Sequence, residues 1–508
     1  MEIRLSYRVL RGTLLAAIGG AGLLLSAVPA GGGVSATAAS AAAPLASSAL
    51  GSLLTYDYGN SRSGDDSVDP RIVGLSTRPA WDDSGLDGAV YGQPLVYDAR
   101  VYVATENDSI YALAAGSGRV LWRLHVGDAV SLSVVDAAPT LGPGCGDIDP
   151  LGITGTPVID PGADELFVAE ETEPPGASGW QGVRHWLVTV SLSTHRELWH
   201  RDIDPPHANS PASYYIPAEQ QRPALTLADG HLYIPFGGLN GDCGQYHGYI
   251  VAVPESGAGA LESYEVPTRR EGAIWETEGA LVSAQGELYV ATGNGSSNSI
   301  DDFDEGNAVV ELSPSLRRLG VWAPVNWVQL NDEDWDLGSS GPIEVPGTSL
   351  LFEAGKPASN GSFGYLMGEG QLGGIGHGAY TGGVCGGGGV FGADASVVLG
   401  SGKNARVLIL APCGSGTEAL EVNTEARTFR PLWSAATGSA NGSPIVAGGV
   451  VWALGWGSAE LYGMAPATGR LLIERATDPL DHFVAPAVGD GMVLVPTANG
   501  VEAFRTIS

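Results

Sequence analysis

The sequence is poor in charged residues, and poorest in basic ones. Charged side chains make up 16% of the 508 residues while hydrophobic ones reach 44%, so the chain can bury a core and is not disordered along its whole length. Only 25 Lys and Arg residues accompany 56 Asp and Glu residues, which gives a formal net charge of -31. A surface of that sign repels phosphate groups. We therefore exclude nucleic acid as a partner and expect no binding to an anionic membrane surface.

Long apolar runs are lacking after the N-terminal region, so the sequence predicts no membrane span. Near the N-terminus, three arginines precede the run TLLAAIGGAGLLLSAV, which is typical of a secretory signal peptide. We place this signal at residues 1–30, with cleavage after Ala30 or, alternatively, after Ala38. Residues 31–52 are rich in Ala, Ser and Gly and predict a disordered leader before a single domain at 53–508. The protein is thus expected to be secreted and to act outside the cytoplasm, in the cell envelope.

Cysteine is scarce, and its spacing excludes two kinds of site. The chain lacks C-x-x-C, which argues against a cysteine metal site, and lacks C-x-x-C-H, so no heme attachment is expected. An even number of cysteines in an oxidising compartment predicts disulfides. Of the three pairings, we prefer Cys145 with Cys243 and Cys385 with Cys413, because the second pair would join neighbouring strands of one repeat.

The motifs of several enzyme classes are also missing. The glycine-rich run 382–393 is not followed by G-K-[ST], so it does not predict a phosphate-binding loop. No H-E-x-x-H occurs, and no G-x-S-x-G stands between a strand and a helix. Zinc proteases and α/β-hydrolases are therefore disfavoured.

Glycine, by contrast, is abundant, at 75 of 508 residues, about twice the usual share. Long helices are improbable in such a chain. Residues 92–126 contain four short β-rich runs separated by turn residues, which predicts one four-stranded antiparallel sheet. The same phrase returns along the chain, and its eight starts fall at Pro94, Pro157, Pro223, Ala280, Pro342, Ala393, Pro444 and Pro486.

Repeated sheets of this size close radially, so the sequence predicts an all-β fold, an eight-bladed β-propeller of four-stranded antiparallel blades, with seven blades as the alternative. The last copy ends without its outer, Trp-bearing strand. Residues 78–85, RPAWDDSG, resemble that strand in the first copy. We expect this N-terminal strand to complete the eighth blade and close the ring.

The phrases YALAAGSGRVLWR and LYGMAPATGRLL resemble the repeat of pyrroloquinoline quinone (PQQ) propellers. That family includes quinoprotein alcohol dehydrogenases and the non-catalytic propeller of bacterial outer-membrane assembly. The resemblance covers about residues 53–508 and is specific for architecture, since the phrase serves packing between blades with or without a cofactor.

The resemblance to the dehydrogenases implies four site residues, which stand in the family's order. In YVATGNG, Asn294 matches the metal ligand, and Trp275 upstream matches the floor beneath the cofactor. Asp336, in Trp-Asp-Leu, matches the catalytic base and a metal ligand, and Lys356 matches the basic residue at the quinone oxygens. Each also has a simpler explanation: a turn for Asn294, a turn cap for Asp336, blade packing for Trp275 and a solvated loop for Lys356.

Two departures from the family pattern concern its calcium site and its pair of adjacent cysteines. Cys243 stands where the family has a metal-binding Glu, and Asp242 beside it is a shorter substitute ligand. The adjacent cysteine pair is missing. A Cys145–Cys243 bridge would tie loops of two blades across the channel mouth and could take the place of that pair.

Two functions follow from these observations. The first is a PQQ- and calcium-dependent dehydrogenase of an alcohol, polyol or sugar that lacks heme and passes electrons to a separate acceptor. The second is a non-catalytic propeller that binds a protein or an envelope polymer. In either case we expect a monomer.

Overall fold

The computed structural model describes residues 51–66, 69–139, 141, 144–173, 179–206, 216–358, 361–437 and 442–508. The expected signal peptide at 1–30 lies outside the described residues, as do all but the last two residues of the expected leader.

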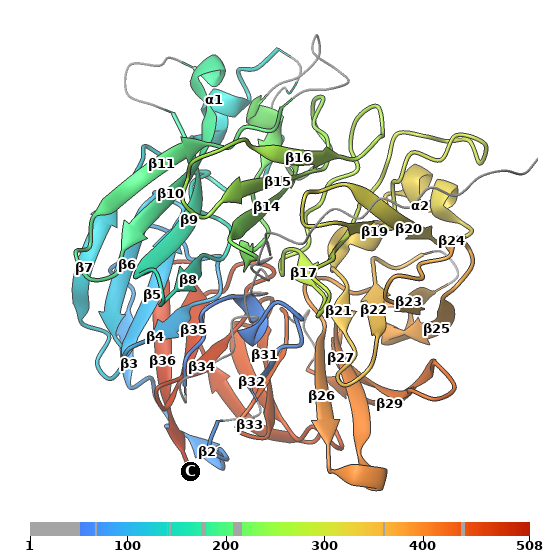
Figure 1. Cartoon of the computed structure of the whole chain (residues 1–508). Helices are drawn as coiled ribbons and strands as arrows, with labels where there is room; N and C mark the ends of the chain where they lie inside the picture. The colour runs from blue at the N-terminus through green and yellow to red at the C-terminus, as the bar shows by residue number, and fades with distance from the viewer. Residues whose placement is uncertain are drawn as a thin grey trace, which may run out of the picture. The chain divides into compact units, whose positions relative to one another are not determined.

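Eight sheets form a ring of antiparallel blades around a central axis (Figure 1), which confirms the eight-bladed propeller. In the described part of the chain the α-helices are two short ones, α1 (Leu132–Val135) and α2 (Trp327–Glu333), and no helix is long and apolar enough to cross a membrane. Every predicted repeat start lies just before or at the first strand of a blade, so the repeat pattern located the blades correctly.

The first seven blades follow one another along the chain, each built from consecutive strands. Blade 1 holds β4 (Leu95–Tyr97), β5 (Arg100–Thr105), β6 (Ser109–Ala114) and β7 (Val120–His125), and blade 2 holds β8 (Val158–Asp160), β9 (Glu165–Thr172), β10 (Arg184–Ser191) and β11 (Glu197–Asp202). Blade 3 holds β13 (Thr226–Ala228), β14 (His231–Gly238), β15 (Tyr249–Pro254) and β16 (Glu262–Glu265), with β12 (Glu219–Gln220) also on β14. Blade 4 holds β17 (Leu281–Val282), β18 (Leu288–Ala291), β19 (Val309–Leu312) and β20 (Arg318–Ala323), with β24 (Gly374–Ile375) parallel to β20.

The remaining blades complete the circle. Blade 5 holds β21 (Ile343–Glu344), β22 (Leu350–Ala354), β23 (Ser362–Gly368) and β25 (Tyr380–Val384), and blade 6 holds β26 (Ala395–Leu399), β27 (Arg406–Cys413), β28 (Gly416–Asn423) and β29 (Thr428–Ala436). Blade 7 holds β30 (Ile445–Ala447), β31 (Val450–Gly455), β32 (Glu460–Met464) and β33 (Leu471–Ala476). Blade 8 holds β34 (Ala487–Gly489), β35 (Met492–Thr497) and β36 (Gly500–Ile507) from the C-terminus.

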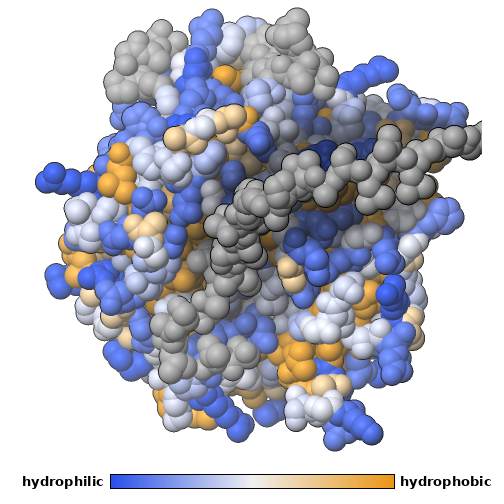
Figure 2. Space-filling model, in the orientation of Figure 1, coloured by the Kyte–Doolittle hydropathy of each residue, from blue (hydrophilic) through white to orange (hydrophobic). Residues whose placement is uncertain are grey.

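The position of each strand in its blade determines how its side chains are buried. In blade 1, all but the last residue of β6 are buried, because neighbouring blades cover both faces of this inner strand. The outer strand β7 mixes exposed residues with buried Trp122. Figure 2 shows hydrophilic residues over much of the visible face, with apolar ones in small patches. The apolar core therefore lies mainly between the blades, as expected for stacked sheets.

The N-terminal strand β3 (Trp81–Asp83) closes the ring by pairing antiparallel with β36, and Figure 1 shows the blue β3 beside the red β36. The indole Nε1 of Trp81 donates to the carbonyl of Ala115 in blade 1, at 2.7 Å. The indole packs against Gly118, whose φ of +68° and whose contact with the ring leave no room for a side chain. The predicted closure is confirmed.

Residues 51–66, which we name the strap, bond to the inner part of every blade. Backbone bonds link Leu53 to blade 1 and the strap carbonyls to blades 2, 4, 5, 6 and 7, through Ile159, Val282, Glu344, Ser396 and Val446. The Asn60 amide donates to Leu227 of blade 3, and the Tyr58 hydroxyl bonds to Val488 of blade 8. Another strand, β1 (Asp65–Asp66), runs parallel to β30, and β2 (Gly74–Leu75), beyond the strap, pairs with β36.

Both preferred disulfides are present, but the reason for the second was wrong. Cys145 bridges Cys243, and Cys385 bridges Cys413. Cys385 follows β25 of blade 5 and Cys413 ends β27 of blade 6. The second bridge therefore joins neighbouring blades rather than strands of one repeat.

Candidate functional site

A cavity with a volume of about 680 Å³ is lined by loops of several blades. A smaller cavity of about 20 Å³ shares Arg222, His482 and Phe483 with it and also touches Tyr56 of the strap. The large cavity thus lies over the strap at the ring's centre. We call it the axial pocket.

Four of the five residues predicted for the cofactor and metal line the axial pocket: Asp242, Trp275, Asp336 and Lys356. Asp242 lies in the loop after β14, and Trp275 lies between β16 and β17. Asp336 precedes a short 3-10 helix in the connection between blades 4 and 5, and Lys356 follows β22 of blade 5. The fifth residue, Asn294, lies directly behind Asp336.

Asp336 and Lys356 form an ion pair, with 2.7 Å between Oδ2 and Nζ. The other carboxylate oxygen, Oδ1, accepts a 2.6 Å hydrogen bond from the backbone N–H of Asn294. Burial raises the pKa of Asp336, although Lys356 opposes that shift. Burial also disfavours charge on Lys356, but Asp336 and Asp334 outweigh it and hold the pKa of the amine above its usual value. The pair gives the pocket a carboxylate of increased basicity beside a permanent cation.

Two cationic side chains lie near the ring of Trp275. The Lys356 amine lies 5.6 Å from the ring centroid, and the Arg222 guanidinium lies 5.5 Å from it and 4.1 Å from that of Phe483. Aromatic rings attract cations at these distances.

Burial and Arg222 lower the pKa of neighbouring His482 to about 4, so that imidazole is neutral near pH 7.

Arg222 also lines the axial pocket, and the sequence did not predict it. One of its terminal nitrogens, Nη2, is buried and has no hydrogen-bond partner among the described residues. Burial lowers its pKa to about 10, so it stays charged at neutral pH. Its place before Pro223, the start of blade 3, was the available clue, because that position faces the axis. A pocket-lining guanidinium with one buried, unpartnered N–H group is suited to an anionic ligand.

Asp242 and the Cys145–Cys243 bridge belong to the pocket wall. The Tyr246 hydroxyl donates to the Asp242 carboxylate, and Arg270 donates to the Asp242 carbonyl at 2.6 Å. The pocket-lining residues next to the bridge come from two loops, after α1 and after β14. The disulfide therefore ties two walls of the pocket together.

The oxygen donors of the predicted calcium site are partly engaged. The amide Oδ1 of Asn294 accepts from Asn307 at 3.1 Å, and its Nδ2 donates to Asp334 at 2.9 Å. Together with Asp242 and Asp336 it offers calcium the right kind of atom but fewer than the six to eight oxygens the ion takes. Calcium at this place would therefore need further oxygens from water or from a bound cofactor, and it would compete with the hydrogen bonds that Asp242 and Asn294 already accept.

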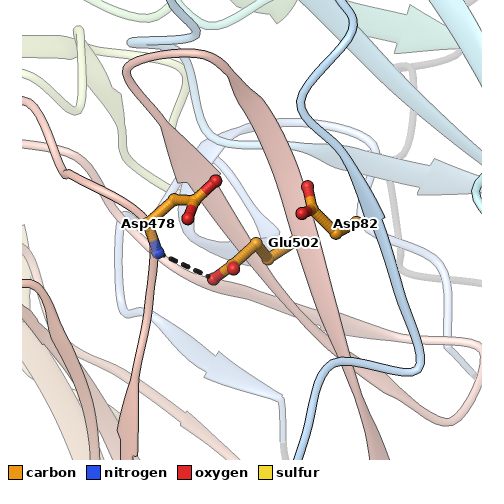
Figure 3. Close-up of side chains that lie close together, drawn as sticks. All are labelled: Asp82, Asp478 and Glu502. Carbon is orange, nitrogen blue, oxygen red and sulfur yellow. Dashed lines mark hydrogen bonds between the residues drawn. The ribbon is translucent and has the colours of Figure 1, made fainter.

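A separate group of carboxylates lies at the closure of the ring (Figure 3). Across the described residues, Asp82, Asp478 and Glu502 are the one set of three such side chains whose ligand atoms all lie within 4.8 Å of one another. Asp82 and Glu502 face each other across the β3–β36 pair, and the Asp478 N–H donates to Glu502 at 3.2 Å. Burial, with Asp478 and Asp82, raises the pKa of Glu502 to about 7. Since Glu502 is hydrogen bonded and Asp82 is exposed, we assign no ion here.

Comparisons with known proteins agree with this architecture. Residues 67–213 match a family of PQQ repeats described as outer membrane protein assembly factor BamB. No curated protein matches the sequence. The fold matches the quinohemoprotein alcohol dehydrogenase from Comamonas testosteroni with a TM-score of 0.60 and 15% identity, over 89% of this chain and 80% of that one.

Two further solved structures show the same fold. A europium-containing methanol dehydrogenase has a TM-score of 0.58 and 12% identity, over 89% of this chain and 90% of that one. BamB from Moraxella catarrhalis has a TM-score of 0.52 and 10% identity, over 86% of this chain and 100% of that one. The class is therefore an eight-bladed propeller with a pocket on its axis. Within that class, residues 67–213 of the chain carry the match to the PQQ-repeat family model.

Proposed function

We propose that the axial pocket binds PQQ and that the protein is a dehydrogenase of an alcohol, polyol or sugar. The observation that carries this proposal is the assembly of Asp336, Lys356 and Trp275 in one pocket, with Asn294 behind the carboxylate. The four residues come from separate segments of the sequence, so turn or packing preferences at each would not by themselves bring them together.

PQQ is flat and carries carboxylates, and the pocket offers complementary groups. The Trp275 ring supplies a surface for a planar ligand, while Arg222 and Lys356 supply positive charge. Asp242, Asn294 and Asp336 would hold calcium, with further oxygens from outside this set. This arrangement would fix the ligand between the aromatic floor and the wall tied by the Cys145–Cys243 bridge.

In the proposed reaction, Asp336 takes the proton of the substrate hydroxyl, because burial makes its carboxylate more basic than usual. Trp275, Arg222 and Lys356 would hold PQQ, which would supply a two-electron oxidant for the hydride of the carbinol carbon, so that the alcohol becomes a carbonyl compound. Lys356 stabilises the Asp336 carboxylate before the proton arrives. Because we expect no heme on this chain, a separate acceptor would reoxidise the quinone.

The test is oxidation of a panel of alcohols, polyols and sugars with a dye as electron acceptor, after loading with PQQ and calcium. Asp336→Asn should lower kcat by about 10²–10⁴-fold, the usual contribution of a general base. Asp301→Asn, which changes an exposed carboxylate in the loop after β18, should leave kcat unchanged. Equal rates for Asp336→Asn and the unaltered protein would contradict the proposal.

A non-catalytic role is the second candidate, and one observation favours it. Tyr246 and Asn307 already engage oxygens of Asp242 and Asn294, two of the three proposed calcium ligands. A propeller that had lost its cofactor would use the loop face to bind an envelope protein or polymer. Failure of PQQ to bind would select this role.

We further propose that residues 1–30 direct export, that 31–52 form a leader, and that the propeller at 53–508 works outside the cytoplasm as a monomer. The two disulfides are consistent with an oxidising compartment. Mass spectrometry of the secreted protein and its sedimentation would test these points.

A further inference from the structure

A second group of buried carboxylates lies between blades 1 and 2, at residues distinct from those of the axial pocket. Asp108 stands in the turn between β5 and β6 and is 0% exposed, and Glu170 in β9 of blade 2 is 4% exposed. Glu106, at the same turn as Asp108, is 2% exposed. Three carboxylates are thus withdrawn from water at one junction of two blades.

Oxygen atoms from both blades approach a single point beside Gly127. A Cβ added to this glycine would lie 2.8 Å from Oε2 of Glu170, 2.9 Å from Oγ1 of Thr172 and 3.1 Å from Oδ2 of Asp108. Because residue 127 is a glycine, this space holds no side chain, and an ion bound there could contact all three oxygens. Two carboxylates and a hydroxyl therefore point toward one small volume.

Each of the three carboxylates has at least one buried oxygen without a hydrogen-bond partner among the described residues, although Oε2 of Glu106 accepts from Gly152 and Thr154. Neither oxygen of Asp108 has a hydrogen-bond partner among the described residues, and neither does Oε2 of Glu170 or Oε1 of Glu106. Among the described residues, no Lys, Arg or His forms an ion pair with Glu106, Asp108 or Glu170. Burying an unpaired carboxylate is strongly unfavourable unless a proton or a cation neutralises it.

We propose that a calcium ion binds at this junction, held by Asp108, Glu170 and Thr172, with Glu106 as a neighbouring negative charge. The donors are all oxygen atoms, which calcium prefers over the nitrogen and sulfur ligands of zinc or copper. The Thr172 hydroxyl accepts from the Asp128 N–H and donates to the Asp128 carbonyl, which leaves it one lone pair for the ion. Bound there, the ion joins blade 1 to blade 2, and water molecules complete the six to eight oxygens that calcium takes.

This site is separate from the one proposed for the cofactor, which uses Asp242, Asn294 and Asp336. Its existence does not depend on PQQ. The two proposals can therefore fail independently.

The test is calorimetric titration of calcium into the full protein after treatment with EGTA and without PQQ. Asp108→Asn and Glu170→Gln should each weaken calcium binding at least about 10-fold, since each removes a charged ligand. Asp336→Asn should retain this binding, and so should Asp128→Asn, whose side chain is 70% exposed beside the same site. No calcium binding to the unaltered protein would overturn the proposal, as would full binding by both Asp108→Asn and Glu170→Gln.

Melting temperatures distinguish a variant that has lost calcium binding from one that folds poorly. In EGTA, Asp108→Asn and Glu170→Gln should melt no lower than the unaltered protein, because each replaces a poorly partnered buried carboxyl group by a neutral amide of similar size. Calcium should raise the melting temperature of the unaltered protein and of Asp336→Asn, but not that of the two junction variants. A calcium response that is lost only in Asp336→Asn would place the ion at the cofactor site and overturn the proposal.

Discussion

Arg222 lines the axial pocket. Its Nη2 atom is buried and has no hydrogen-bond partner among the described residues. Replacing it should weaken an anionic ligand most, because charge-assisted hydrogen bonds in a buried site are strong. We expect Arg222→Met to raise the Kd for PQQ by about 10–100-fold, measured by calorimetry. Arg119→Met, at an exposed position in blade 1, should bind PQQ like the unaltered protein. Unchanged binding by Arg222→Met would show that the guanidinium does not face the ligand.

Gly118 tests the contact that closes the ring. Gly118→Ala would force a side chain into the left-handed region at φ +68° and into the Trp81 indole, 2.6 Å away. We expect it to lower the free energy of unfolding by about 1–3 kcal/mol, measured by urea denaturation. Gly116→Ala, two residues earlier, meets nothing within 4 Å and should change stability far less. Equal stabilities for the two variants would contradict the role given to this contact.

The sequence predicted the pocket residues that lie in recognisable motifs. It did not predict a residue that reaches the pocket only because loops far apart in the sequence meet there. Trp275, Asn294, Asp336 and Lys356 stand beside short phrases with a known order, and the structure brings them together. Arg222 lies outside any such phrase. Its importance arises from which loops meet at the axis, and a single sequence does not encode that in a local pattern.

The strap contacts more blades than any single strand of a blade does. A variant lacking residues 1–66 loses the bonds to all eight blades but keeps β3, which closes the ring. We expect its melting temperature to fall by more than about 5 °C, since hydrogen bonds of buried backbone groups are left unmade. A variant lacking only residues 1–50 is the control and should melt like the mature protein. Equal melting temperatures for the two would show that the ring needs no strap.

The blades were predictable from the sequence because every copy repeats the same alternation of β-rich runs and turns. The closing strand was predictable because RPAWDDSG carries the tryptophan that the last copy lacks. The strap was not predictable, since its extended residues bond through their backbone and show no period of their own. The pairing of Cys385 with Cys413 was right, but its reason failed because the chain passes from one blade to the next between them.

For the whole molecule, buried carboxyl groups determine how stability depends on pH. Burial raises the pKa of both Glu106 and Glu170 to about 8. A raised acid pKa means that the folded chain holds protons which the unfolded chain has already lost, so stability is greatest at low pH and falls as pH rises toward 8. In EGTA, the melting temperature should therefore decrease between about pH 5 and pH 8, and the net charge of -31 should add to the fall.

Calcium should flatten that pH dependence, because it replaces the proton as the partner of the buried carboxylates. Glu106→Gln should lessen the slope in EGTA. Thermal melts at fixed ionic strength across this range would measure both effects. A melting temperature that rises with pH in EGTA would contradict the assignment of these groups.

The most direct test of the proposed function is calorimetric titration of PQQ into the mature protein, with and without calcium, repeated on Asn294→Ala and Asp336→Ala. We predict tight binding that depends on calcium and is weakened in both variants. No heat of binding and no rise in melting temperature with PQQ would contradict a cofactor site in the axial pocket, and the propeller would then be a scaffold.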